Sequence, residues 1–149
     1  MSALTLNALS PAPGRLLRAG LWIAQGLLAL VFIASGLTKL LLPITELAAM
    51  MKWPGDYPAV FVRFIALVDL AGGLGILLPS LTRIRPRLAV LAAFCCTVLQ
   101  VLAIGFHAMR GEFGVLPLNL VLLPLCMFVL WGRARRVAVA PRAGQATAG

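Results

Sequence analysis

The sequence has little charge for its length. Charged residues make up 11% of its 149 residues, less than half of the roughly 25% that is usual in a soluble domain. Acidic residues are scarcest, with four carboxylates against 13 lysines and arginines, and the chain holds a single histidine. A soluble protein of this size would lack the polar groups to cover its surface.

The sequence also lacks the short motifs that equip a chain for chemistry of its own. It contains no CxxC pair, no nucleotide-binding glycine motif, no flavin motif and no pair of haem ligands. A single histidine is too few for a typical metal site, so we expect no metal site in this chain. Three cysteines, Cys95, Cys96 and Cys126, fall inside apolar runs, where we expect buried thiols that act as small apolar side chains. The prediction therefore leans away from a self-contained enzyme, and no catalytic residue is assigned.

Long apolar runs are what the sequence has instead. Hydrophobic residues make up 62% of the chain, and its mean hydropathy is +1.02. Four runs stand out, at residues 19–42, 59–78, 88–106 and 115–132. Each is close to the ~20 residues that a helix needs to cross the hydrocarbon core, and backbone amides in lipid must pair within their own segment. The sequence predicts an all-α fold, an integral membrane four-helix bundle in one domain over residues 15–135.

The basic residues are distributed unevenly between the two sides of the predicted membrane. Four of them lie on one side with the carboxylates: Lys39, Lys52, Arg63 and Arg110. The other nine lie on the opposite side: Arg15, Arg18, Arg83, Arg85, Arg87, Arg133, Arg135, Arg136 and Arg142. The positive-inside rule then places both termini in the cytoplasm. Because the charges form short clusters between apolar runs, the net charge of +9 does not indicate nucleic-acid binding.

The segments outside the spans are short. Residues 1–14 and 136–149 are rich in Ala, Pro, Gly and Ser, and we expect disordered cytoplasmic ends. Residues 45–53 predict a short helix at the membrane surface, with Thr45 as its N-cap and Pro54 and Gly55 ending it.

One carboxylate lies in the middle of a predicted span. Asp69 is the eleventh of the 20 residues in the run 59–78, and lipid penalises an ionised group at that depth by about 2.5–3.5 kcal/mol. It must face the inside of the bundle, pair with a cation, or carry a proton. Gly72 and Gly73 follow on the same helix face, where they would let another backbone approach closely or would line a pocket.

The other runs bring polar groups to the same half of the membrane. Ser35, Gly36 and Lys39 share one face of the first run, and Gln100 and His107 lie seven residues apart along the third. We expect a polar pocket that opens to the extracytoplasmic side, and almost nothing comparable in the cytoplasmic half. Its predicted ligand-binding residues are Lys39, Asp69, Gln100, His107 and Asn119.

Each of these groups also has a simpler explanation. Lys39 and Arg63 are near enough to span ends to extend to the interface and act only as anchors. His107 follows the third run and is an interfacial residue in the same interpretation. Gln100 and Asn119 are of the type that bonds one membrane helix to another. Asp69 and Lys39 form a structural ion pair on this reading, without any ligand.

Five short motifs carry a resemblance when they are read in order. They are Gly36–Leu40, Asp69–Gly75, Leu77–Pro79, His107–Glu112 and Asn119–Leu120. This series resembles the DoxX-like family of small four-helix bacterial membrane proteins, over about residues 15 to 135. The acidic position in the second span is often Glu in such proteins, whereas Asp69 is one methylene shorter.

The resemblance implies a four-helix bundle in the bacterial inner membrane. The family is named after subunits of a thiosulfate:quinone oxidoreductase, which implies a membrane subunit linked to redox or stress processes and a quinone-like ligand as one candidate. A redox protein or a second copy of the chain would then be its partner. The alternative is a small proton-coupled transporter that uses Asp69 as its titrating carboxylate.

Overall fold

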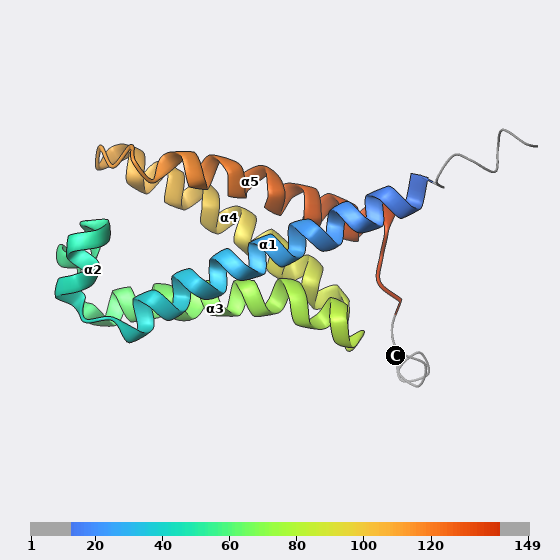
Figure 1. The fold of residues 1–149 in the computed structure, drawn as a ribbon, viewed down its shortest axis with the longest axis horizontal. Coiled ribbons are helices and arrows are strands. Elements are labelled where there is room, and N and C mark those ends of the chain that lie inside the picture. Colours follow the sequence, from blue (N-terminus) through green and yellow to red (C-terminus); the bar gives the residue numbers. More distant parts are fainter. Residues whose placement is uncertain (1–12, 141–149) are drawn as a thin grey trace, which may run out of the picture.

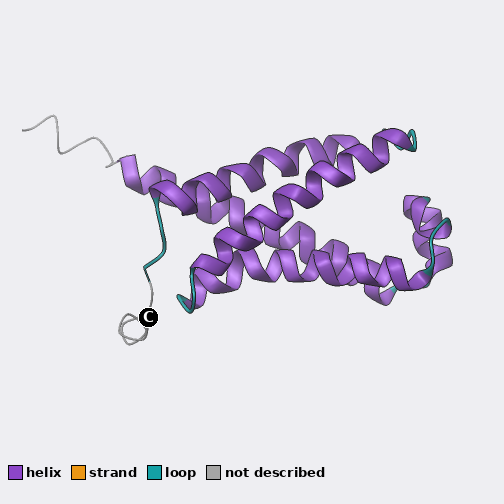
Figure 2. Ribbon diagram, turned by 180° about the vertical axis from the view of Figure 1, so that it is seen from behind, coloured by secondary structure: helices purple, strands orange, loops and turns teal. Residues whose placement is uncertain are grey.

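The computed structural model describes residues 13–140, and its regular elements there are all helical (Figures 1 and 2). They are α1 (Pro13–Leu41), α2 (Ile44–Met51), the 3₁₀ turn η1 (Trp53–Gly55), α3 (Ala59–Thr82), α4 (Arg87–Met109), α5 (Leu116–Trp131) and the π-helical turn η2 (Gly132–Arg136). Four helices, α1, α3, α4 and α5, are long and apolar enough to cross a membrane. The predicted all-α, four-helix membrane fold is confirmed. Most of the predicted disordered ends lies outside the described residues, although α1 already includes residues 13 and 14.

The four long helices form a closed ring of antiparallel neighbours. α1 packs against α3, α3 against α4, α4 against α5, and α5 returns to contact α1. Figure 1 shows that the start of α1, the α3–α4 turn and the end of α5 lie at one end of the bundle, while α2 and the α4–α5 turn lie at the other. Many large apolar side chains point outward from these helices, as expected where the surrounding solvent is lipid.

The core between the helices contains two of the three cysteines. Cys96 and Cys126 are buried in one cluster with Leu28, Phe32 and Ile76, whereas Cys95 is exposed on the outer surface. The expectation of three buried thiols is therefore wrong for Cys95, because adjacent residues on a helix are about 100° apart and face different sides.

The short helix α2 begins differently from the prediction. Its N-cap is Pro43, without a side-chain hydrogen bond, so Thr45 lies inside the first turn and the predicted Thr45 cap is wrong. The fixed φ of proline suits the entry to a helix. The end of α1 is stabilised instead by Arg63, which donates to the carbonyl oxygens of Lys39 and Leu42.

Glycines allow α1 and α3 to approach each other closely. A Cβ atom on Gly36 would lie 2.8 Å from the carbonyl oxygen of Ala66 and 2.7 Å from Cγ of Leu70. A Cβ on Gly73 would lie 2.8 Å from Ile33. Such small-residue contacts are a usual way for membrane helices to associate.

We expect Gly36→Ala to lower the free energy of unfolding by at least about 1 kcal/mol, because a backbone oxygen cannot move aside for the new methyl group. Gly26→Ala is the matched control on the same helix, since a Cβ there meets nothing within 4 Å and alanine is the better helix former. Thermal unfolding in detergent compares the two variants. Equal midpoints for both would contradict the proposed close packing.

Candidate functional site

A cavity of about 350 Å³ lies inside the half of the bundle that carries α2. Side chains from α1, α3, α4, α5 and η1 line it. All five residues predicted to bind a ligand lie on its wall, together with Ser35. The predicted close-packing residues Gly36, Gly72 and Gly73 are not part of the wall; they pack against neighbouring helices.

A buried ion pair stands in the cavity wall. Lys39 Nζ lies 2.7 Å from Asp69 Oδ2, and the two residues are only 8% and 5% exposed. Ser35 joins them, because its hydroxyl accepts from Lys39 Nζ at 2.5 Å and donates to the same carboxylate oxygen at 3.0 Å. The pair neutralises two charges that would each be costly in lipid. The simpler explanation of Asp69 as an ion-pair partner is thus part of the observed geometry.

The cavity wall also contains an amide oxygen that has no hydrogen-bond donor within the described part of the chain. Gln100 is 4% exposed, and its Oε1 atom is buried with no hydrogen-bond partner among residues 13–140. A buried acceptor without a donor costs about 1–3 kcal/mol. Asn119, from α5, adds a second amide to the cavity wall. A bound molecule with a hydroxyl or amine would satisfy the free oxygen.

Aromatic rings line the part of the cavity near α2. Trp53 lies edge-on to Phe61 and Phe106, with ring centroids 6.4 and 6.1 Å apart. All three rings line the cavity. Such edge-to-face contacts stabilise by about 0.5–1.5 kcal/mol each beyond their buried area, so this wall is a preformed apolar surface.

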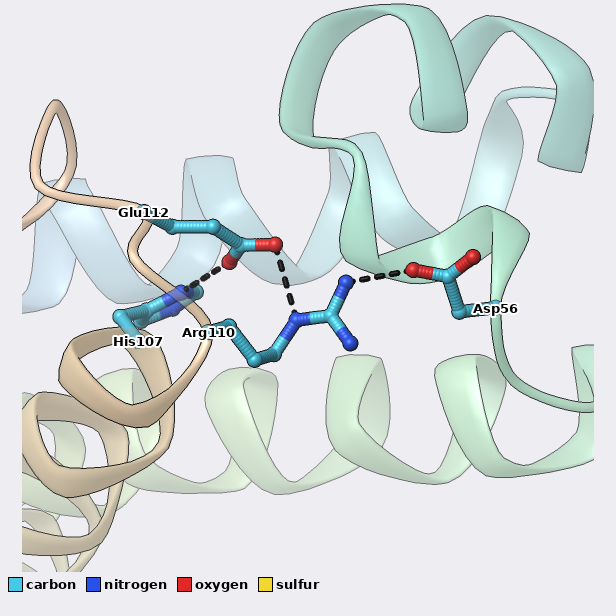
Figure 3. A network of polar contacts seen from close by, with 4 residues as sticks. All are labelled: Asp56, His107, Arg110 and Glu112. Carbon is cyan, nitrogen blue, oxygen red and sulfur yellow. Dashed lines mark hydrogen bonds and ion pairs between the residues drawn. The ribbon is translucent and has the colours of Figure 1, made fainter.

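An ionic network connects the α4–α5 turn to the segment that follows α2 (Figure 3). Glu112 Oε2 lies 2.6 Å from Nδ1 of His107, and its Oε1 accepts from Arg110 Nε at 2.8 Å. Arg110 extends on to Asp56, 2.5 Å away. His107 therefore uses one ring nitrogen to hold the turn, and it also lines the cavity. Although burial raises the pKa of Glu112, hydrogen bonds from His107 and Arg110 outweigh it and hold that pKa below its ordinary value.

The lowered pKa of Glu112 predicts a dependence of stability on pH. The ionic contacts of Glu112 contribute fully to the stability of the fold above the unfolded-state pKa, near 4.3. This contribution is lost as the pH falls through the lower folded-state pKa. We expect Glu112→Gln to lower the free energy of unfolding by about 1 kcal/mol at pH 7. In a plot of the thermal unfolding midpoint against pH, the fall on the acid side should be shallower in this variant. Glu46→Gln, at an exposed position of α2, is the control. An acid limb unchanged in Glu112→Gln would contradict this role.

Sequence reasoning missed the partners in this network. From the sequence, Arg110 and the carboxylates are expected only to lie on the same side of the membrane, although Arg110 and Glu112 both belong to the motif His107–Glu112. The five-residue spacing of His107 and Glu112 places them on either side of a predicted turn, and this spacing is the sequence feature that indicates their contact. Which carboxylate meets Arg110 depends on the folding of α2 over the turn, which the sequence does not encode locally.

The expectation of an apolar opposite half is wrong. Gln25, Ser80 and Arg133 are all buried there. Gln25 Nε2 donates to Ser80 Oγ at 2.9 Å, and its Oε1 accepts from Nε and Nη2 of Arg133 at 2.8 and 2.5 Å. The residues come from three helical elements that meet only in the folded bundle, and Arg133 resembles an ordinary charge at a span end.

The four long apolar helices define a multi-pass helical membrane protein. The match to a family is specific: the DoxX-like family model covers residues 23–129, most of the helical domain. The chain belongs to the DoxX-like family. No curated protein and no solved structure matches it.

Proposed function

We propose that the cavity binds a small ligand with a polar head and that the protein serves as a binding or accessory subunit of a membrane redox or stress process. The observation that carries the proposal is a cavity that joins an apolar aromatic wall to a cluster of polar groups. Its volume of about 350 Å³ falls within the ~300–1,000 Å³ usual for small-molecule sites.

The charges of the site favour a ligand without net charge. Asp69 and Lys39 already neutralise each other, so an ionic head group would leave one charge uncompensated in a region of low dielectric. The ligand instead needs a donor for Gln100 Oε1 and an apolar body for the ring of Trp53. A quinone in its reduced, hydroxyl-bearing form satisfies both requirements. The oxidised form keeps the apolar body, and its carbonyl oxygens would accept from the side-chain amide of Asn119 on the same wall. A separate redox protein would have to supply the redox chemistry, and a second copy of the chain is the other partner that we propose.

The proposal also covers the orientation of the protein in the membrane and the membrane in which it lies. Within residues 13–140, eight basic residues lie at the end opposite the cavity, which favours cytoplasmic termini and a cavity in the extracytoplasmic half of the inner membrane. The alternative of proton-coupled transport through Asp69 has weaker support, because the carboxylate is engaged by Lys39 and Ser35.

Trp53 provides a way to test binding, because it lines the cavity and quinones quench indole fluorescence on contact. The probe is a short-chain benzoquinone, titrated into the purified protein in nanodiscs with Trp22 and Trp131 replaced by Phe. We expect saturable quenching that weakens at least about tenfold in Ala103→Phe, where the ring fills the cavity. Val101→Phe is the matched control, since Val101 is 53% exposed on the outer face of the same helix.

Two results would contradict the proposed site. Quenching that never saturates, or that is equal in Ala103→Phe and Val101→Phe, would show that the quinone meets the protein only through the lipid. Saturable quenching that only Ala103→Phe weakens would support the cavity as the binding site.

A further inference from the structure

A second cavity lies at the opposite end of the bundle and shares no residue with the first. Its volume is about 800 Å³. It lies among the end of α3, the α3–α4 turn, the start of α4, η2 and the segment 138–140, which Figure 1 shows at one end of the bundle. It is lined by Ser80, Arg85, Pro86, Arg87, Leu88, Val90, Arg133, Ala138, Val139 and Ala140.

The charge of this cavity is one-sided. Arg85 and Arg87 reach its wall from the α3–α4 turn and the first residue of α4, and Arg133 reaches it from η2. None of the described residues that line it carries a carboxylate. The chain has four carboxylates in all. Three are paired with cations elsewhere, Asp69 with Lys39, and Asp56 and Glu112 with Arg110, and the fourth, Glu46, is on α2 at the far end. The three guanidinium groups therefore have no anionic partner among residues 13–140.

Arg133 is held in place before any ligand arrives. It is 4% exposed, with Nε and Nη2 fixed by Gln25 Oε1 and its guanidinium stacked 4.9 Å above the ring of Trp22. Its Nη1 makes only a long contact of 3.4 Å with the carbonyl of Val137. A buried cation that is oriented but not neutralised is stabilised by an anion that enters beside it.

Ser80 adds a neutral donor to the same wall. It is 2% exposed, and its Oγ accepts from Gln25 Nε2 at 2.9 Å. Its own hydroxyl hydrogen has no acceptor among the described residues. Leu88 and Val90 give the cavity an apolar side next to these donors.

We propose that this cavity binds a phosphate group, with Arg85, Arg87 and Arg133 as its cations and Ser80 as a hydrogen-bond donor. Arginine clusters match phosphate oxygens in charge and in geometry, and basic pockets at the ends of membrane helices are suited to anionic lipid head groups. The phosphate is carried either by an anionic phospholipid, whose chains would follow Leu88 and Val90, or by free phosphate from the aqueous side.

The test uses the full-length protein in phosphatidylcholine nanodiscs and measures the thermal unfolding midpoint, which rises when a ligand binds the folded state. One arm adds phosphatidylglycerol to the bilayer. The other adds inorganic phosphate, with potassium chloride at equal ionic strength as its reference. The test variant is Arg85→Gln/Arg87→Gln, at two exposed positions of the wall. The matched control is Arg15→Gln/Arg135→Gln, which removes the same charge from exposed positions at the same end.

We expect phosphatidylglycerol to raise the midpoint of the wild type and of the control, and about tenfold more of it to be needed in the test variant. Stabilisation by phosphatidylglycerol alone assigns the phosphate to a lipid, and stabilisation by inorganic phosphate as well assigns it to the phosphate group itself. If both double variants lose the same amount of this stabilisation, it comes from the overall positive charge at this end of the bundle and not from the cavity. That result would overturn the site. No stabilisation in either arm would overturn it as well.

Discussion

Replacing Lys39 with methionine is expected to lower the free energy of unfolding by about 3–5 kcal/mol, the usual cost of removing one partner from a buried ion pair. Asp69 would keep its place in the middle of the bundle, at 5% exposure, with only the hydroxyl of Ser35 to satisfy it. Burial of an uncompensated carboxylate, and not the loss of the lysine, accounts for most of the expected effect. Unfolding titrations in mixed micelles would measure it.

Two further variants separate the charge from the side chain. Lys39→Met/Asp69→Asn removes both charges and should recover most of the lost stability, because the remaining amide needs no counter-ion. Lys52→Met removes an exposed lysine and should change little. A cost for Lys39→Met no greater than that for Lys52→Met would show that the ion pair does not stabilise the bundle.

Gln25→Leu is the second large expected effect, about 1.5–3 kcal/mol, the range for a hydrogen bond to a charged group. Gln25 Oε1 is the acceptor for two nitrogens of the buried Arg133, and Gln25 Nε2 bonds the carbonyl of Ile76 and the hydroxyl of Ser80. Leucine has nearly the same volume, so packing changes little and the loss falls on the polar contacts. Thermal and denaturant unfolding of the two proteins give the difference.

The matched double variant Gln25→Leu/Arg133→Met removes the buried charge together with its acceptor. It should be more stable than Gln25→Leu alone, since no guanidinium is left without a partner. If the double variant is the less stable of the two, Arg133 contributes to the fold through its packing on Trp22, and the account of this cluster is wrong.

The architecture could be predicted from the sequence because lipid leaves a chain few choices. Four apolar runs of near 20 residues have to become helices, and the charge of Asp69 has to turn inward. The spacing of Ser35 and Lys39 on one helix face identified the groups that meet Asp69. Local periodicity was enough in these cases, because the partners lie on faces that the bundle must bury.

The remaining contacts depend on how segments distant in the sequence meet. Gln25 and Arg133 are 108 residues apart, and nothing near either of them indicates the other. Asp56 and Arg110 meet only because α2 and η1 lie beside the α4–α5 turn. Thr45 is a residue type common at N-caps, but α2 already begins at Ile44, with Pro43 as its N-cap. Such contacts require the fold and cannot be inferred from single-helix patterns.

The central claim is that the cavity beside Asp69 and Gln100 holds a small molecule, and native mass spectrometry of the protein extracted gently from its membrane tests it most directly. We predict a bound small molecule in the wild type and in Val101→Phe, and its absence in Ala103→Phe, where the new ring occupies the cavity. Equal occupancy in Ala103→Phe, or no bound molecule in any of the three proteins, would contradict the claim and leave the polar cluster as a structural ion-pair network.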